Sequence, residues 1–387
     1  MIDGTRSHLN RDSVGPWTES RPIRRVLMTC DAVGGVWTYA CELARALADH
    51  QVDVLVAAMG PAPSTGQIEE IAALDHVQIV HADFALEWMD SPWEEVERAG
   101  EWLLRLASDF EPDVIHLNGF AHADLPWPAP VLVVAHSCVL TWWRAVKGER
   151  APQRYREYIR RVSETLRSAF VVTPTEAFRG QLASEYGIKP RGMTISNARS
   201  CCTTAVPAKE PFVLSAGRLW DDAKNLALLD TVAPALDWPV LVAGNEELSG
   251  SGQFTSCNLR LLGKCEPARM AQTMARASIY AAPALYEPFG LAILEAALHG
   301  CALVLSDIPT LREVWSGCAE FAPPKDPSAW RRVLGKLIAD PRRREQMQHR
   351  ARQAAAVFSV QKQSDAYMSA YRSLLQTADR RSEMIAA

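Results

Sequence analysis

The sequence lacks the cysteine spacing of a metal or redox motif. No two of its nine cysteines stand in C-x-x-C spacing, and no group of histidines and cysteines has the spacing of a zinc site. An odd number of scattered cysteines also argues against a disulfide framework. These patterns favour a reduced, cytoplasmic protein.

Long apolar runs and an excess of positive charge are missing as well. No run reaches the ~18 apolar residues that a membrane-spanning helix needs, and residues 1–22 contain no apolar core of a signal peptide. We expect residues 1–22 to form a flexible tail. The chain has 41 lysines and arginines against 45 acidic residues, a net charge of −4, so nothing favours a nucleic acid as partner.

What the sequence does contain is an alternation of strand and helix patterns, repeated twice. Short apolar runs such as RRVLMTC (24–30), VLVVAHS (131–137) and FVLSAGR (212–218) are separated by amphipathic helical segments. Apolar strands separated by helices form a parallel sheet that is covered on both faces. We therefore predict an α/β protein with two doubly wound, Rossmann-like domains that face a cleft.

A polar stretch over residues 199–211 interrupts the alternation. It places the first domain at residues 23–205 and the second at residues 206–362. Residues 363–387 are expected to form a C-terminal helix that packs back on the first domain. Because ligands of doubly wound sheets bind at the carboxyl ends of the strands, functional residues are expected there.

Two glutamates stand eight positions apart in ALYEPFGLAILEAALHG (284–300). Glu287 follows a predicted strand and precedes a proline, which disfavours helical angles at the residue before it. Glu295 lies about two turns into a helix predicted over 289–298, which Gly300 would end. The two carboxylates can bracket one elongated ligand, and the helix N-terminus between them suits a phosphate. The plainer alternatives are a helix-capping role for Glu287 and an exposed helical side chain at Glu295.

Two cations follow the first strand of the second domain. Arg218 and Lys224 flank the loop residues LWDDA directly after FVLSAG. Cations at the carboxyl end of a strand suit a leaving diphosphate, because its negative charge grows in the transition state. The alternative is a surface pairing of these cations with Asp221 and Asp222.

In the first domain, Gly34 and Gly35 lie between a predicted strand and a helix. A glycine pair lets the backbone approach a ligand closely, although it also suits a plain tight turn. The stretch is not G-x-G-x-x-G, so a nicotinamide or flavin site is poorly supported. His136 ends a strand at the same edge, where a lone histidine is most often a packing or hydrogen-bonding residue.

Several motifs, taken together in their order along the chain, resemble those of the retaining glycosyltransferases with the two-Rossmann-domain (GT-B) architecture. The resemblance is greatest to the large bacterial family four. The resemblance covers nearly the whole chain beyond residue 22. It departs from the family at Asn225, where glycine is frequent, at Ser137, where aspartate is frequent, and at SNAR (196–199), where relatives commonly have Asn-Gly. The motifs are DAVGGVWTYACELARAL (31–47), AHS (135–137), AGRLWDDAKN (216–225), EPFGLAILEA (287–296) and GCALVLSDIPTLREV (300–314).

The resemblance implies a role for each residue. Glu287 would bind hydroxyls of the transferred sugar, Glu295 would hold the ribose, and His136 would lie near a far hydroxyl of the sugar. The implied catalytic set is Glu287, His136, Arg218 and Lys224. The implied donor-binding set is Arg218, Lys224, Lys264, Cys265, Glu287, Phe289, Gly290, Leu291 and Glu295, with Gly34 and Gly35 on the acceptor or phosphate side.

The activity that the resemblance implies is transfer of a hexose, with retention, from a nucleoside diphosphate sugar such as UDP-glucose. The acceptor would be a saccharide or a lipid-linked sugar in the synthesis of cell-surface polysaccharides or glycoconjugates. The sequence contains no Asp-x-Asp, the pair that holds a metal in the other glycosyltransferase architecture, so we expect no metal and no cofactor. Two alternatives stay open: a non-catalytic subunit that binds sugar nucleotides, and a nucleotide-sugar epimerase on the same fold.

Residues 144–167 contain eight arginines and lysines against three glutamates, directly after Trp142 and Trp143. A basic helix beside exposed tryptophans would suit anionic lipid, which would place the protein peripherally at the inner face of the membrane through the region Trp142–Arg167. The alternative is a solvated basic face with buried tryptophans.

Overall fold

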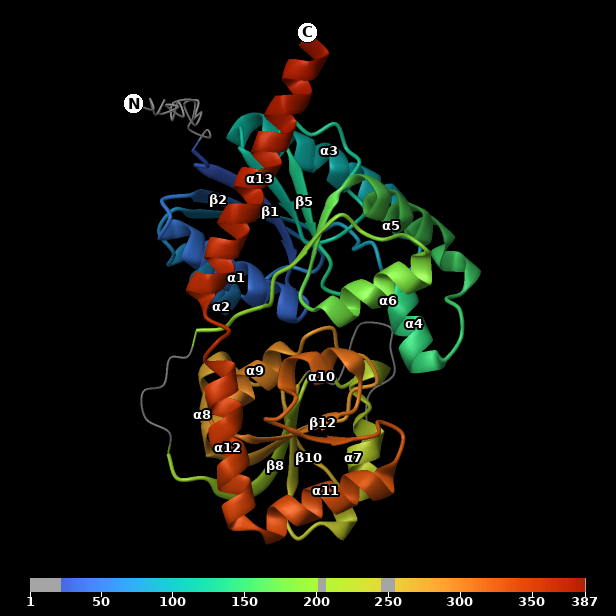
Figure 1. Cartoon of the computed structure of the whole chain (residues 1–387), viewed down its shortest axis with the longest axis vertical. Coiled ribbons are helices and arrows are strands. Elements are labelled where there is room, and N and C mark those ends of the chain that lie inside the picture. Colours follow the sequence, from blue (N-terminus) through green and yellow to red (C-terminus); the bar gives the residue numbers. More distant parts are fainter. Residues whose placement is uncertain (1–21, 201–206, 245–254, 387) are drawn as a thin grey trace, which may run out of the picture.

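The computed structural model describes residues 22–200, 207–244 and 255–386, arranged as two lobes (Figure 1). The tail predicted at residues 1–22 lies outside this part, apart from its last residue. The predicted domain boundary between residues 205 and 206 falls in the undescribed residues 201–206. The tail and the boundary therefore remain predictions.

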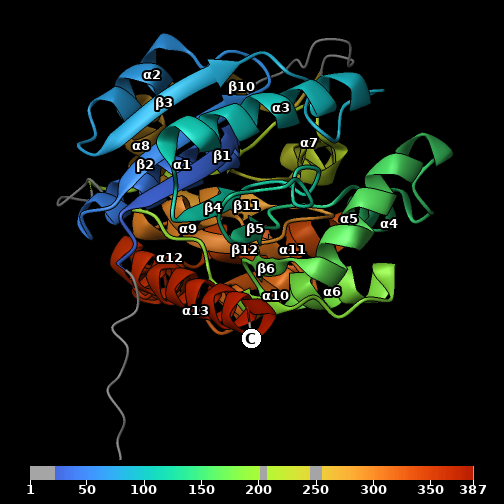
Figure 2. The same ribbon diagram turned by 90° about the horizontal axis from the view of Figure 1, so that it is seen from above.

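The first lobe is built on a seven-stranded parallel sheet in the order β3-β2-β1-β4-β5-β6-β7. Seen from above, β3 with α2 and the pair α4 and α5 lie at opposite sides of this lobe (Figure 2). The strands are β1 Arg25–Asp31, β2 Asp53–Met59, β3 Val77–Ala82, β4 Val114–Leu117, β5 Val131–Val134, β6 Phe170–Thr173 and β7 Gly192–Thr194.

The second lobe has a six-stranded parallel sheet in the order β10-β9-β8-β11-β12-β13. Both sheets are doubly wound, which confirms the fold class predicted from the alternating pattern. The strands are β8 Glu210–Ala216, β9 Val240–Ala243, β10 Arg260–Gly263, β11 Ala277–Ala282, β12 Ala302–Ser306 and β13 Glu320–Ala322.

Helices cover both sheets, and four of them begin at a proline: Pro267, Pro309, Pro327 and Pro341. Proline suits the first helical position because its missing N–H would have no helical partner there. The α-helices are α1 Gly35–Ala48, α2 Thr65–Ala72, α3 Trp93–Phe110, α4 Val139–Lys147, α5 Arg156–Ser168, α6 Glu176–Tyr186, α7 Leu226–Val232, α8 Pro267–Arg276, α9 Leu291–Leu298, α10 Pro309–Trp315, α11 Pro327–Ala339, α12 Pro341–Ala355 and α13 Val360–Ala386.

The last helix returns to the first lobe, as predicted, and runs along it (Figure 1). Tyr367 and Tyr371 of α13 are fully buried in the apolar core shared with α1 and β1. The Tyr371 hydroxyl lies 2.6 Å from Nδ1 of His116, and Nε2 of His116 lies 3.3 Å from the Tyr39 hydroxyl. Burial lowers the pKa of His116 to about 3, so its imidazole is uncharged in these contacts with the two tyrosines.

The lobes also contact each other directly beside the cleft. Tyr286 of the second lobe reaches the start of α4, where its hydroxyl accepts a hydrogen bond from the Cys138 N–H at 3.0 Å and lies 2.9 Å from Thr141 Oγ1. Thr175, at the start of α6, donates from its hydroxyl to the Pro288 carbonyl at 3.0 Å. Because these contacts flank the turn that carries Glu287, they fix that turn relative to the first lobe.

Candidate active site

The predicted site residues follow the strands at which the two sheets reverse their order. In the first sheet the reversal lies between β1 and β4, and in the second between β8 and β11. A doubly wound sheet binds ligands at this switch point, where the connections leave in opposite directions and open a crevice. Gly34 follows β1, Arg218 and Lys224 follow β8, and Glu287 follows β11, so the strand order brings them to one cleft.

Glu287 lies in the turn between β11 and α9, as predicted. Its carbonyl accepts a hydrogen bond from Thr310 Oγ1 at 2.6 Å. Gly290 precedes the helix with a φ of 91°, and a Cβ there would lie 2.7 Å from Ile293 Cδ1, so only glycine fits this turn. The helix begins at Leu291 rather than at residue 289, and Gly300 follows it with a φ of 74°, the predicted left-handed end.

Lys224 forms an ion pair with Glu287. Its Nζ donates to Glu287 Oε2 at 2.7 Å, and the two side chains are 22% and 18% exposed. Gly217 makes room for the lysine, since a Cβ there would lie 3.1 Å from Lys224 Cδ. The alternative pairing of Lys224 with Asp222 is wrong, because Asp222 instead accepts from Lys147 at 2.6 Å.

Arg218 forms an ion pair with Asp221. This is the pairing that the alternative interpretation of the sequence predicted for this arginine. Its Nη2 donates to Asp221 Oδ2 at 2.7 Å, and its guanidinium lies 5.2 Å from the centre of the Trp220 ring. Burial raises the pKa of Asp221, but the attraction and hydrogen bond of Arg218, the charge of Lys224 and the Ala223 N–H together outweigh it, and the pKa lies below the usual value. The Nε of Arg218 is buried without a hydrogen-bond partner, so the guanidinium keeps a free donor.

Gly34 and Gly35 face these groups from the first lobe. Gly34 precedes α1 with a φ of 89°, and a Cβ there would lie 3.3 Å from Arg218 Nη1. A Cβ on Gly35 would lie 3.4 Å from Leu291 Cδ1 of α9. The glycine pair therefore brings the N-terminus of α1 against both the cation and the helix of the second lobe.

His136 lies at the end of β5 in a fixed orientation. Asn118 donates from Nδ2 to the Thr29 carbonyl at 2.6 Å, which turns its Oδ1 toward His136 Nε2, 2.8 Å away. An amide oxygen only accepts, so Nε2 carries the proton. Burial lowers the pKa of His136 to about 3, and the neutral ring therefore presents Nδ1 as an acceptor.

Glu295 has a partner that the sequence did not indicate. Arg199 donates from Nε to Glu295 Oε1 at 2.7 Å and from Nη1 to the buried carboxylate of Glu42 on α1. Ser200 also donates to Glu42. Arg199 thus links α1 to α9 at the position where the motif departs from the family, and a ribose at Glu295 would share this carboxylate with the arginine.

Three predicted donor-binding residues lie apart from the charged cluster. The side chain of Phe289 is buried in the core of the second lobe against Phe358, with ring centres 5.6 Å apart, so only its backbone is available to a ligand. Lys264 is exposed and Cys265 is half-buried. Both follow β10, the edge strand, which is separated from β8 by β9.

The segment after His136 is a helix, α4, and its tryptophans point into the cleft. Trp142 donates from Nε1 to Asp221 Oδ1 at 3.2 Å, and Trp143 packs edge-on against Trp142 with ring centres 5.7 Å apart. Both are half-buried. The expectation of exposed tryptophans is therefore wrong: the Trp142 ring contacts Asp221 of the second lobe, and the Trp143 ring packs against Trp142 and Tyr155 of the first.

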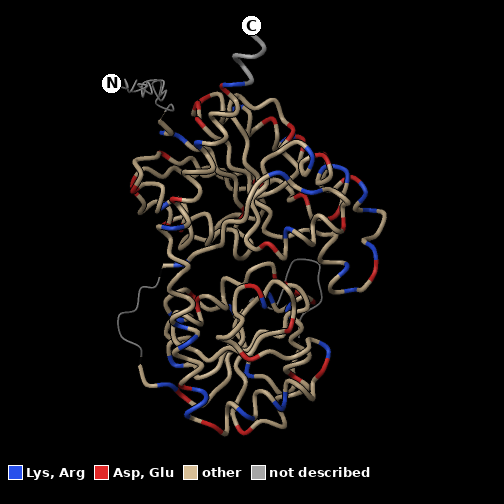
Figure 3. Tube along the Cα trace, in the orientation of Figure 1, with Lys and Arg blue, Asp and Glu red and all other residues tan. Residues whose placement is uncertain are grey.

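Two of the four arginines of α5, Arg160 and Arg161, are paired with acids. Arg160 contacts Glu157 and Glu164, and Arg161 contacts Glu157 and Glu97. The hydrogen bond from Arg160 lowers the pKa of Glu157 to about 2. Figure 3 shows basic and acidic residues interspersed in this region, which favours the solvated, paired surface over a uniform basic face.

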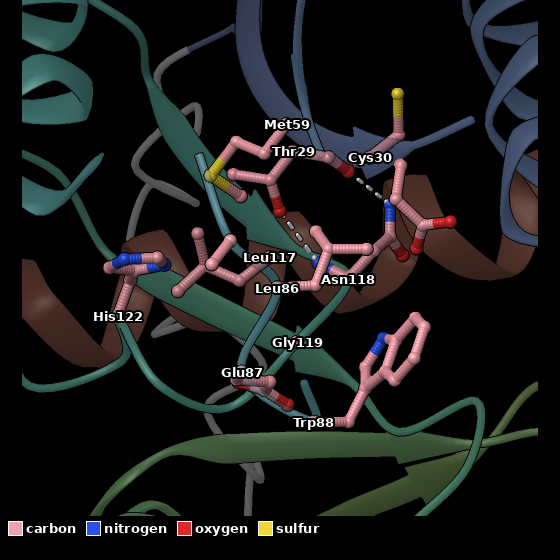
Figure 4. Close-up of a pocket in the computed structure, with 12 residues that line it drawn as sticks. Thr29, Cys30, Met59, Leu86, Glu87, Trp88, Leu117, Asn118, Gly119 and His122 are labelled. Atoms are coloured by element: carbon pink, nitrogen blue, oxygen red, sulfur yellow. Dashed lines mark hydrogen bonds between the residues drawn. The ribbon is translucent and has the colours of Figure 1, made fainter. Parts of the chain in front are cut away.

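A cavity of about 390 Å³ opens between the lobes beside Arg218. Its first-lobe wall carries Asp31, Glu87, Asn118 and His136. A smaller recess of about 60 Å³ adjoins it behind Glu87, Trp88 and Asn118 (Figure 4). The aromatic residues lining the larger cavity are Trp88, Phe120, Trp142, Trp143, Tyr155, Tyr158 and Trp220.

The described residues contain neither a cluster of metal-ligating side chains nor a membrane-spanning helix. In this part of the chain, no three histidine, cysteine, aspartate or glutamate side chains are grouped as metal ligands would be. No helix within the same ranges combines the length and apolar character needed to cross a membrane.

The chain matches known glycosyltransferases in both lobes. Residues 33–198 match the family described as Glycosyltransferase Family 4, and residues 203–354 match the one described as Glycosyl transferases group 1. Phosphatidyl-myo-inositol mannosyltransferase of Mycolicibacterium smegmatis is 31% identical over 135 residues, which cover 32% of this chain and only 35% of that relative. D-inositol 3-phosphate glycosyltransferase of Kineococcus radiotolerans is 25% identical, over 89% of this chain and 91% of that one.

Solved structures agree on the fold. Sucrose-phosphate synthase from Thermosynechococcus elongatus superposes with a TM-score of 0.76 at 16% identity, over 92% of this chain and all of that one. HepE of Anabaena in complex with UDP-glucose gives 0.68 at 15% identity, over 90% and 99% of the two chains. The fold and the two matches define a glycosyltransferase of the GT-B type. Within that class, the chain belongs to glycosyltransferase family four.

Proposed function

We propose that this protein transfers a hexose, with retention and without a metal ion, from a nucleoside diphosphate sugar to a saccharide or lipid-linked acceptor. The observation that carries the proposal is the cluster of Arg218, Lys224 and Glu287 at the switch point of the second sheet, facing Gly34. It combines two cations for a diphosphate with a carboxylate for the sugar. Membrane contact and a role in cell-surface polysaccharide synthesis stay predictions.

The charged groups give each part of the donor a partner. Arg218 has a free Nε donor and Lys224 a second cation for the diphosphate. These fixed cations are worth most as negative charge builds up on the leaving group, because they need no reorganisation at that moment. The first amides of α9 add unpaired N–H groups on the same side.

The sugar would lie between Glu287 and His136. Lys224 holds the Glu287 carboxylate in place, and one of its oxygens remains able to accept from sugar hydroxyls. His136 offers Nδ1 as a further acceptor from the opposite lobe. Hydroxyls bound at both ends would fix the anomeric carbon against the acceptor, which is the main contribution of positioning to catalysis.

The proposed reaction follows the front-face route. The acceptor oxygen bonds to the anomeric carbon as the bond to the phosphate oxygen breaks, on the same side of the sugar. The acceptor proton passes to the leaving phosphate oxygen, so no protein base is required. The transition state is oxocarbenium-like, and the chain contributes positioning and the cations that stabilise the departing diphosphate.

UDP-glucose is the donor we propose to test first. HepE of Anabaena, which shares the fold, was solved with UDP-glucose. The relatives named above act, by their names, on inositol-containing compounds, which is compatible with a polyhydroxylated acceptor.

The test is the anomer released from UDP-glucose. In the absence of an acceptor, slow transfer to water yields free glucose, whose anomeric proton is resolved by NMR before mutarotation equilibrates it. Retention predicts that α-glucose appears first, because the donor is α-linked. Initial release of β-glucose would overturn the retaining assignment, and no binding or turnover of any nucleotide sugar in a thermal-shift panel would overturn the proposed function.

A further inference from the structure

The interdomain cavity is where an acceptor would meet the donor. It is lined by Arg218 and Asp221 from the second lobe and by Asp31 and His136 from the first. Its volume of about 390 Å³ falls in the ~300–1,000 Å³ range of small-molecule sites. A ring bound in it would lie beside the cation that holds the diphosphate, which is the placement that attack on the anomeric carbon requires.

Two carboxylates on the first-lobe wall have acceptor capacity to spare. Asp31 accepts the Val33 N–H at Oδ1, 2.8 Å away. Glu87 accepts the Ala121 N–H at Oε2, 2.6 Å away, and the Phe120 N–H at both Oε2 and Oε1, 2.9 and 3.2 Å away. A carboxylate offers about four lone-pair sites, so both groups can accept further hydrogen bonds, and both line the cavity. Figure 4 shows Glu87 next to Trp88 and below Asn118.

The remaining wall is aromatic. Trp88, Trp143 and Trp220 all line the cavity, and the rings come from both lobes. Flat apolar walls with a few convergent polar acceptors suit a ring that has apolar faces and hydroxyls at its edge. A sugar or a cyclitol has this shape and chemistry.

The charge of the lining disfavours a phosphate on the acceptor. Asp31, Glu87 and Asp221 face the cavity against Arg154 and Arg218. Arg218 is held by Asp221 and belongs to the donor side. Arg154 is exposed and lies over the ring of Tyr155, 5.0 Å from its centre. A phosphate inside the cavity would lie near the carboxylates of Asp31 and Glu87. Like charges repel strongly where water is scarce, so this arrangement would be unfavourable.

We propose that this cavity binds the acceptor as a neutral polyhydroxylated ring, a monosaccharide or cyclitol without a phosphate on the bound ring, with Asp31 and Glu87 accepting hydrogen bonds from its hydroxyls. The inference rests on the proposed function and names the acceptor class for the same site. Of these two acids, Asp31, whose carboxylate is influenced by the charge of Arg218, would lie nearer the donor.

The ionisation of the two acids supports this assignment. Burial raises the pKa of Asp31 to about 6 and that of Glu87 to about 7. The ionised form of each is therefore costly in the empty cavity, and hydroxyl donors from a bound ring would stabilise it. Acceptor binding should accordingly weaken as the pH falls below about 6.

The experiment is calorimetry on the full chain saturated with UDP. The probes are glucose, mannose and myo-inositol as neutral rings, with glucose 6-phosphate and inositol 1-phosphate as their charged counterparts. We expect at least one neutral ring to bind at least about tenfold more tightly than its phosphate. Asp31→Asn and Glu87→Gln each keep one side-chain oxygen that can accept from the backbone N–H groups. Each should weaken binding of that neutral ring about tenfold or more.

Asp83→Asn is the matched control, because Asp83 is exposed and does not line the cavity; it should leave ring binding unchanged. Tighter binding of the phosphorylated rings, lost in Arg154→Ala, would overturn the proposal in favour of an anionic acceptor. UDP binding with no binding of any neutral ring would overturn it as well. Failure to bind UDP or UDP-glucose at all would instead count against the proposed function, which keeps the two failures distinguishable.

Discussion

The two walls of the cleft are assembled in different ways. The second lobe supplies its charged groups from the loops after two adjacent strands, β8 and β11, and joins them through the Lys224–Glu287 ion pair. The first lobe gathers Asp31, Glu87, Asn118 and His136 from four separate connections. A diphosphate sugar has a fixed chemistry that a compact motif can hold, whereas an acceptor varies and is met by residues that can change independently.

The two walls also differ in charge. The donor side exposes a cation, since the side chain of Arg218 is 40% exposed. The proposed acceptor side presents the carboxylates of Asp31 and Glu87. If this comparison holds, substitutions on the donor wall should change turnover and nucleotide binding, and substitutions on the acceptor wall should spare the nucleotide.

The largest expected effect is at Lys224. Its proposed interaction with the diphosphate would strengthen as the glycosidic bond breaks, so Lys224→Ala should lower kcat by about 10²–10³ with little effect on ground-state binding. Lys224→Arg should recover little, because the planar guanidinium is a donor of different shape. Steady-state rates measure both.

Asp222→Ala is the control for Lys224, because it removes an exposed carboxylate of the same loop that pairs with Lys147. Exposed pairs of this kind contribute about 0–1 kcal/mol to stability, so its kcat should stay near that of the unmodified protein. A near-normal kcat in Lys224→Ala would contradict the proposal that this lysine stabilises the leaving diphosphate.

The next effect separates the two glutamates. Glu287→Ala should lose most turnover yet bind the free nucleoside diphosphate, because its proposed contacts are to the sugar. Glu295→Ala should weaken binding of the nucleoside diphosphate by ~1–3 kcal/mol if a charged hydrogen bond to the ribose is lost. Calorimetry with UDP tests both, and unchanged binding in the Glu295 variant would show that this carboxylate serves only Arg199.

The smallest effect is on stability at the acceptor wall. The pKa of Asp31 is raised to about 6 in the folded chain from a usual value of 3.8, so the folded state binds more protons than the unfolded state between these values. Stability therefore falls as pH rises through this window. Asp31→Asn should raise Tm at about pH 7.5 and raise it less at about pH 4.5. An equal shift at both pH values would contradict the burial of this charge.

Much of the fold was predictable because its signals are local. Apolar runs marked the strands, and Gly300 marked the end of α9, as predicted. Helix α4 was missed, since its nine residues follow His136 without a side-chain cap. Helix α2 was missed although Ser64 and Gln67 form a capping box, a signal present in the sequence.

Within the site, the motif residues were predictable, but their partners were not. Lys224 and Glu287 are 63 positions apart, and Arg199 and Glu42 are 157 apart. Such pairings depend on which strands become neighbours and on how the lobes meet, which no local pattern encodes. The orientation of His136 likewise depends on Asn118, from another strand connection.

The central claim is that Arg218 and Lys224 supply the positive charge that a metal supplies elsewhere. Its most direct test is turnover of the nucleotide sugar in excess EDTA, with magnesium and manganese added back in parallel. The account predicts the same rate with and without chelator, and a rate lost in Lys224→Ala that neither ion restores. Loss of turnover in EDTA, recovered on adding either ion to the unmodified protein, would contradict it.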